Sequence, residues 1–97
     1  MKTIGYFPEA RAELGAATAV SRDPTEFRRV VDEALRDIAS GVIAHAVVPR
    51  TPCRECVPTG VPYSIIYIET DDEIRVVAFT HHKRRRGYWK ARLRPKP

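Results

Sequence analysis

Residues 61 to 93 read VPYSIIYIETDDEIRVVAFTHHKRRRGYWKARL, and the first half of this stretch decides the fold. Residues 64–68 and 74–79 form two runs rich in β-branched and aromatic side chains, which favour strands. The link at residues 69–73 favours a turn, because Asp and Thr side chains hydrogen-bond the local backbone. Both runs are almost continuously apolar, as in strands that are covered on both faces. The sequence therefore predicts a central β-hairpin.

A cationic segment follows this hairpin directly. Residues 83 to 97 contain eight Lys and Arg side chains and no acid, so the net charge of +5 leaves −3 on residues 1 to 82. A molecule polarised in this way attracts an acidic partner or a phosphate backbone to one end. The alternative is a solvated basic tail that keeps the protein soluble.

Upstream of the hairpin, the sequence predicts a short strand at residues 2–6 and two helices. Pro8 suits the first turn of a helix that ends at about residue 20. Asp23 is a good N-cap and Gly41 a good residue just past a helix end, so the second helix spans about residues 24–40. Apolar side chains recur at helical spacing along one face of this helix: Phe27, Val30, Val31, Ala34, Leu35 and Ile38.

These elements predict an α+β fold in a single domain over residues 1–97. The short link between the helices favours an antiparallel helical hairpin, and we expect it to pack on one face of a small antiparallel sheet of three strands. The sequence has no apolar run of membrane-spanning length and no apolar segment typical of a signal peptide, so we expect a cytoplasmic location.

Cys53 and Cys56 form a Cys-x-x-Cys motif, which in other contexts is half of a metal site or a redox pair. In an extended segment, residues three apart point to opposite faces, so we expect no shared metal and no disulfide here. The alternative that we favour is one buried and one half-exposed thiol. We expect neither a metal nor a cofactor in this protein.

Catalytic side chains are available after the hairpin. Cleavage of RNA through the 2′-OH needs a base, an acid and a cation at the phosphate, and His81, Tyr88 and Arg84 have suitable chemistry. The alternative is that His81 only closes the last strand. Trp89 could stack on bases, but we expect it to be buried against the sheet or the helices.

The same stretch resembles a known family. The matching blocks are VPYSIIY at residues 61–67, AFTH at residues 78–81, Arg84, YW at residues 88–89 and Arg92. Together they are similar to the C-terminal half of the RelE/ParE superfamily, the toxins of bacterial type II toxin–antitoxin pairs. The resemblance implies that part of residues 53–57 pairs with the strand at residues 64–68 and supplies the third strand of the sheet.

Two residues depart from the family pattern. Val61 stands where the family often has Phe, and Arg86 stands where many members have Pro. The second departure affects the path that we expect for the basic loop.

The resemblance implies a toxin that arrests growth and is neutralised by a cognate antitoxin, whose flexible segment folds on binding. One branch of the superfamily stabilises DNA gyrase–DNA cleavage complexes and needs no catalytic residue. The other branch cleaves ribosome-bound mRNA and would use His81, Arg84 and Tyr88 here. The strongest ribonuclease members of the superfamily carry a cluster of Lys and Arg in the middle of the sheet. Here Arg54 is the only basic residue between Arg50 and Arg75, so we favour the gyrase branch.

If the protein acts on gyrase, the C-terminal cations form a binding surface rather than a catalytic site. The residues expected to bind are Arg84, Arg85, Arg86, Lys90 and Arg92. A third interpretation, from another functional class, is a non-toxic basic module that binds nucleic acid.

Overall fold

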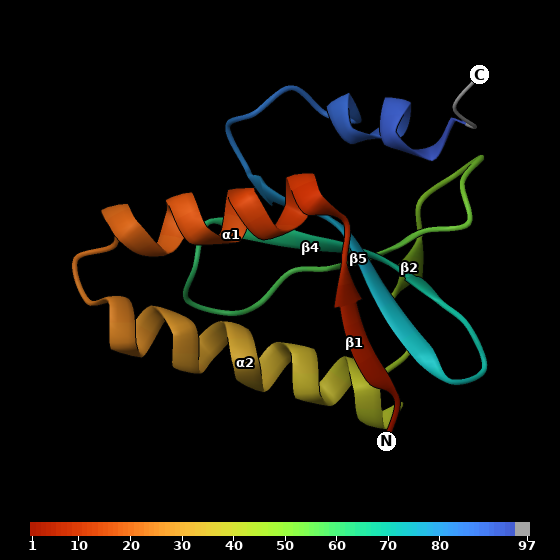
Figure 1. Ribbon diagram of the computed structural model, residues 1–97, viewed down its shortest axis with the longest axis horizontal. Coiled ribbons are helices and arrows are strands. Elements are labelled where there is room, and N and C mark those ends of the chain that lie inside the picture. The colour runs from red at the N-terminus through yellow and green to blue at the C-terminus, as the bar shows by residue number, and fades with distance from the viewer. Residues whose placement is uncertain (95–97) are drawn as a thin grey trace.

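The structure is a computed structural model that describes residues 1–94. Its helices are α1 (Pro8–Val20), α2 (Pro24–Ser40) and a short 3₁₀ helix, η1 (Tyr88–Leu93). Its strands are β1 (Thr3–Tyr6), β2 (Ala46–Val47), β3 (Arg54–Cys56), β4 (Tyr63–Glu69) and β5 (Glu73–His81). The helices α1 and α2 lie side by side in opposite directions, and η1 lies apart from them near the C-terminal end (Figure 1).

The strands form one five-stranded sheet in the order β1-β5-β4-β3-β2. The predicted hairpin of β4 and β5 lies at its centre, and β3 pairs antiparallel with β4 as expected. The α+β prediction is confirmed, but the sheet is larger than the predicted meander and is mixed. The strand β2 extends it at one edge, and β1 pairs parallel with β5 at the other.

Both faces of the sheet are covered, as the apolar runs predicted. On one face, side chains from the two helices pack against residues such as Ile65, Ile74 and Phe79. On the other face, Trp89 of η1 packs with Ile66 and other buried side chains of the sheet. The two central strands therefore have no face exposed to solvent along most of their length.

A β-bulge in β5 sets which side chains reach each face. Ala78 is paired with Ile66 and Val76 with Tyr67, so Val77 has no partner on β4. An extra residue of this kind interrupts the strict alternation of a strand. As a result, Val77 and Ala78 both contribute to the η1 side, and Phe79 returns to the helix side.

The helix ends follow the local sequence. The Asp23 side chain accepts a hydrogen bond from the Glu26 N–H at 3.0 Å, and Gly41 ends α2 with a φ of 72°, which favours glycine. The helix α1 has no side-chain cap, but Pro8 fills its first turn. Within residues 1–94, neither helix is both long enough and apolar enough to cross a membrane.

The prediction of one half-exposed thiol was wrong. Cys53 and Cys56 are both buried and unbonded, on opposite faces of the sheet. Burial raises the pKa of both thiols, that of Cys56 to about 11, so neither is ionised near neutral pH. The thiols are packing groups, because η1 covers Cys53 on one side and the helices cover Cys56 on the other.

We predict that Leu35→Ala lowers the free energy of unfolding by about 2–5 kcal/mol, because Leu35 is buried between α2 and the sheet and truncation leaves a cavity. Val42→Ala, at an exposed site, should change it by less than about 0.5 kcal/mol. Urea unfolding followed by circular dichroism measures both values. Equal effects of the two substitutions would contradict the packing of α2 on the sheet.

Candidate functional site

The C-terminal segment folds back onto the sheet after β5. A loop at residues 82–87 reverses the chain, and η1 then lies beside the sheet (Figure 1). Trp89 is 3% exposed and packs with Cys53, Ile66 and Val77, so the expected burial of its ring is confirmed. Gly87 has a φ of 75° at the start of η1, a conformation that glycine adopts without strain.

The carboxylate of Glu13, on α1, joins this segment to the rest of the protein. Arg92 donates to both of its oxygens, at 2.8 and 3.0 Å, and Arg84 donates to one at 3.3 Å. The Tyr88 hydroxyl and the backbone N–H of Phe79 also donate to it, the latter at 3.1 Å. The Glu13 side chain is only 14% exposed, so one half-buried anion binds donors from three different parts of the chain.

The position of Glu13 follows from the sheet. The pairing of β1 with β5 ends at Val76, where the chain turns into α1. Beyond that point, the edge of β5 has lost its neighbouring strand, and its polar groups need other partners. The Val77 carbonyl accepts from Arg92 at 2.9 Å, and the Phe79 N–H donates to Glu13. The side chains of Glu13 and Arg92 thus continue the hydrogen bonding along the edge of β5 beyond the end of β1.

The protonation states of this cluster follow from its contacts. Burial by itself would raise the pKa of Glu13, but hydrogen bonds from Arg92, Tyr88 and the Phe79 amide outweigh it and lower the pKa below its ordinary value. Burial and the hydrogen bond to Glu13 raise the pKa of Tyr88. Near neutral pH, the carboxylate is therefore ionised and the phenol is neutral.

Two guanidinium groups also contact the Tyr88 ring. Arg84 lies over its face with a guanidinium carbon 3.8 Å from the ring centroid, and Arg92 lies 5.2 Å from it. Such cation–π contacts restrain the ring. Tyr88 is therefore fixed by its hydroxyl and by its face at the same time.

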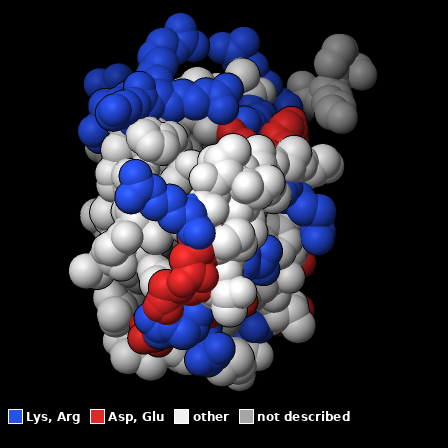
Figure 2. All heavy atoms as spheres, turned by 90° about the vertical axis from the view of Figure 1, so that its left-hand side faces the viewer, with Lys and Arg blue, Asp and Glu red and all other residues white. Residues whose placement is uncertain are grey.

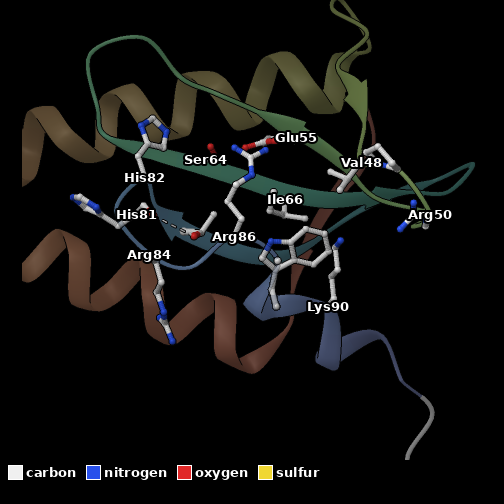
Figure 3. Close-up of a pocket in the computed structure, with 14 residues that line it drawn as sticks. Val48, Arg50, Glu55, Ser64, Ile66, His81, His82, Arg84, Arg86 and Lys90 are labelled. Carbon is white, nitrogen blue, oxygen red and sulfur yellow. Dashed lines mark hydrogen bonds between the residues drawn. The ribbon is translucent and has the colours of Figure 1, made fainter.

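A cleft of about 400 Å³ lies between η1, the loop after β5 and the sheet. Figure 3 shows Arg86 reaching across it toward Glu55. In the same view, Arg84 extends away from the cleft toward α1. The charged residues whose side chains remain at the cleft are mostly cations: Arg50, Arg86 and Lys90, with Glu55 as the acid.

The cations also gather on the outer surface at this end of the molecule. Figure 2 shows Lys and Arg side chains crowded at the top, with acidic side chains mostly further down. The residues 82–86 are all exposed. The concentration of positive charge at one end, predicted from the sequence, is thus present in the folded protein.

The structure brings some of the candidate residues together and separates others. Arg84 and Tyr88 meet at Glu13, and Arg92 joins them there with a side chain that is largely enclosed. The His81 ring points away from the cleft (Figure 3). Its Nδ1 accepts from the Lys83 N–H at 3.0 Å, and the ring packs edge-on against Tyr63, on the helix side of the sheet.

Glu13 was missed in the sequence. Its signal was an acid at the border of the apolar stripe of α1, directly before Leu14 and three positions after Ala10. A side chain there faces partly inward, where an acid needs a partner. The identity of that partner depends on the path of the C-terminal segment, which local sequence does not specify.

Two solved structures have a similar fold. A chain of the chromosomal ParDE toxin–antitoxin system from P. aeruginosa superposes with a TM-score of 0.67, covering 84% of this chain and 96% of that one at 16% identity. A copper-bound mutant toxin from Helicobacter pylori superposes with a TM-score of 0.66, with the same coverage and identity.

This chain has the RelE/ParE fold. The resemblance of residues 61–93 is therefore confirmed at the level of the fold. No protein-family model matches the chain, and neither does any curated protein. The side chains that donate to Glu13, namely Arg84, Tyr88 and Arg92, belong to the stretch that carries the sequence resemblance, whereas Glu13 itself lies on α1.

We predict that Glu13→Gln lowers the free energy of unfolding at pH 7 by about 1.5–3 kcal/mol, because charge-assisted hydrogen bonds are lost. The folded pKa of Glu13 lies below the unfolded value of 4.5, so its contribution is complete above that pH and disappears as the pH falls through the folded pKa. The difference between wild type and variant should therefore shrink in acid. Urea unfolding, followed by the fluorescence of Trp89, measures it at each pH.

The control is Glu33→Gln, which removes an exposed carboxylate paired with Arg29 on α2. It should change the free energy of unfolding by less than about 0.5 kcal/mol. A Glu13→Gln effect as small as this, or one that does not change with pH, would contradict the role assigned to the carboxylate.

Proposed function

We propose that this protein is the toxin of a type II toxin–antitoxin pair. Two independent observations support this. The fold is that of known toxins from such systems, and the motif blocks of residues 61–93 match the superfamily at the spacing of its C-terminal half. The exposed cations at one end give such a toxin a surface for an acidic or phosphate-bearing target.

We further infer that it acts on DNA gyrase through this surface and not by cleaving RNA. The observation that carries this inference is the state of Tyr88 and Arg84, both bound to Glu13. A general acid must be free to transfer its proton to the leaving group, and a phenol with a raised pKa and a hydrogen bond to a buried carboxylate is poorly suited to that. Binding to a protein–DNA complex has no such requirement.

The cations then divide into two groups. Arg85, Arg86 and Lys90 are exposed, and none of them is paired with an acid in the described residues. They are the side chains that we assign to direct contact with the target. Arg84 and Arg92 act through Glu13, by holding η1 in place.

The runner-up is a ribosome-dependent mRNA endonuclease. One observation favours it: His81 is among the residues that line the same cleft as Arg86 and Lys90, so a candidate acid–base residue borders cations that could hold a phosphate. Loss of a catalytic acid or base typically costs about 10²–10⁴ in rate, which would abolish growth arrest. This difference in magnitude separates the two mechanisms.

We predict that induction of the protein arrests growth and that Arg85→Ala/Arg86→Ala weakens the arrest strongly, because two cations act together in steering and contact. His81→Gln and Tyr88→Phe should retain most toxicity while folded. In each induced culture, the DNA-damage (SOS) response and cleavage of polysome-associated mRNA are measured together. The expected result is an SOS response with intact mRNA.

The matched control is Arg22→Ala/Arg36→Ala, which removes the same charge from exposed sites near the helices. It should leave toxicity unchanged. Cut mRNA without an SOS response, abolished by His81→Gln, would contradict the gyrase mechanism and favour the endonuclease. A folded protein that is harmless at high expression would contradict the toxin function itself.

A further inference from the structure

The cleft beside η1 has a polar floor that the proposed function does not use. Ser64 of β4 is only 2% exposed, and it shares a face of the sheet with Ile66, which packs under Trp89. Its hydroxyl borders the cleft and has no hydrogen-bond partner within residues 1–94. Because leaving a buried polar group unpaired is costly, Ser64 indicates a ligand that supplies the missing partner.

An acid lies beside this hydroxyl on the floor. Glu55 of β3 is paired with Ile66, so it faces the same side of the sheet as Ser64. It is half-buried, and it takes part in none of the ion pairs of the described residues. Arg86 reaches toward it across the cleft without forming an ion pair (Figure 3). The floor thus presents a carboxylate with two free acceptor oxygens next to a free hydroxyl.

The other end of the cleft is cationic. Figure 3 shows Arg50 and Lys90 at the end that lies away from Ser64. The strand pairing agrees, because the turn of Arg50 bonds to Cys53, before β3, whereas Cys56, at the far end of β3, pairs next to Ser64. Neither Arg50 nor Lys90 forms an ion pair within residues 1–94. One cleft therefore combines hydrogen-bond acceptors at one end with free cations at the other.

This combination selects the class of ligand. A plain anion is repelled by Glu55, and a plain amine is repelled by the cations. A molecule with N–H donors at one end and a phosphate at the other satisfies both ends. The cleft volume of about 400 Å³ is at the small end of the range for ligand pockets, roughly 300–1,000 Å³. These properties fit a single nucleotide rather than a strand.

The carboxylate also selects the base. Guanine presents two neighbouring donors, N1–H and the N2 amino group, to the two oxygens of a carboxylate, and its O6 accepts from a hydroxyl beside them. Adenine and cytosine place a ring nitrogen with a lone pair beside their one amino group, and uracil places a carbonyl on each side of its N–H. Each of these would turn a lone pair toward Glu55, so guanine fits best.

We propose that the cleft is a binding site for a free guanine nucleotide. Glu55 accepts from N1–H and the N2 amino group, and Ser64 donates to O6. Arg50 and Lys90 bind the phosphate at the other end. Arg86 lies over the plane of the base, since guanidinium groups stack on bases.

A bound nucleotide occupies side chains that the target also needs. Arg86 and Lys90 are among the cations assigned above to direct contact with gyrase, so nucleotide and target compete for them. This competition rests on the proposed function, whereas the nucleotide site itself does not. The level of free guanine nucleotide would then set how much of the toxin is able to bind its target.

The test is calorimetric titration of the folded full-length protein with guanosine 5′-monophosphate (GMP). AMP, guanosine and inorganic phosphate should each bind about tenfold or more weakly than GMP, because each lacks the contacts at one end. The amide resonances of Ser64 and Glu55 should shift with GMP. A single-stranded tetranucleotide that contains one guanine should bind no more than about tenfold more tightly than GMP, as expected for a site that holds one nucleotide.

Glu55→Gln separates recognition of the base from simple electrostatics. The new amide replaces one acceptor with a donor, so GMP should bind at least about tenfold more weakly. Inorganic phosphate should bind more tightly, because a negative charge has been removed from the cleft. Ser64→Ala should weaken binding of GMP without changing that of phosphate. The matched control is Glu33→Gln, at an exposed site on α2, which should alter both affinities by less than about twofold.

Four results would overturn the proposal: equal binding of GMP and AMP, phosphate binding as tight as that of GMP, a Glu55→Gln variant with raised affinity for GMP, or a tetranucleotide that exceeds the tenfold limit. The first two and the last are measured on wild-type protein, so they stand even if a variant fails to fold. Since binding is measured without cells, a harmless protein that binds GMP refutes the toxin function and not the nucleotide site.

Discussion

The structure depends on one interaction, the binding of the Glu13 carboxylate at the edge of β5. The strand β1 covers this edge only as far as Val76, and the bulge at Val77 then turns the next groups outward. Glu13 and Arg92 bind the Phe79 N–H and the Val77 carbonyl, which have no strand partner, and in doing so they join α1 to η1. A buried, charged hydrogen-bond network of this kind fixes geometry strongly because each member is costly to leave unpaired.

This network determines what the cationic segment can do. It binds Arg84, Tyr88 and Arg92 on the α1 side, and it leaves Arg85, Arg86 and Lys90 exposed around the cleft. Three consecutive arginines thus have two different roles, because Arg84 binds Glu13 whereas Arg85 and Arg86 stay exposed. The composition of the segment does not distinguish these roles. The proposed action on gyrase uses the exposed group.

Local patterns predicted the elements well, and long-range contacts explain the rest. The bounds of α1 and α2 followed from Pro8, Asp23 and Gly41, because caps and turns are determined by neighbouring residues. The parallel pairing of β1 and the bulge at Val77 were not predictable, since both depend on packing between distant segments. Glu13 was missed for the same reason: its donors lie 66 to 79 positions away.

The most direct test of this account is hydrogen exchange at the Phe79 amide at neutral pH. This N–H points away from β4 and has no strand beside it, and Glu13 is its acceptor. The account predicts protection comparable with amides inside the β4–β5 ladder, and its loss in Glu13→Gln while the rest of the ladder stays protected. Exchange at the rate of the amides in the loop at residues 82–87, or protection unchanged in Glu13→Gln, would contradict it.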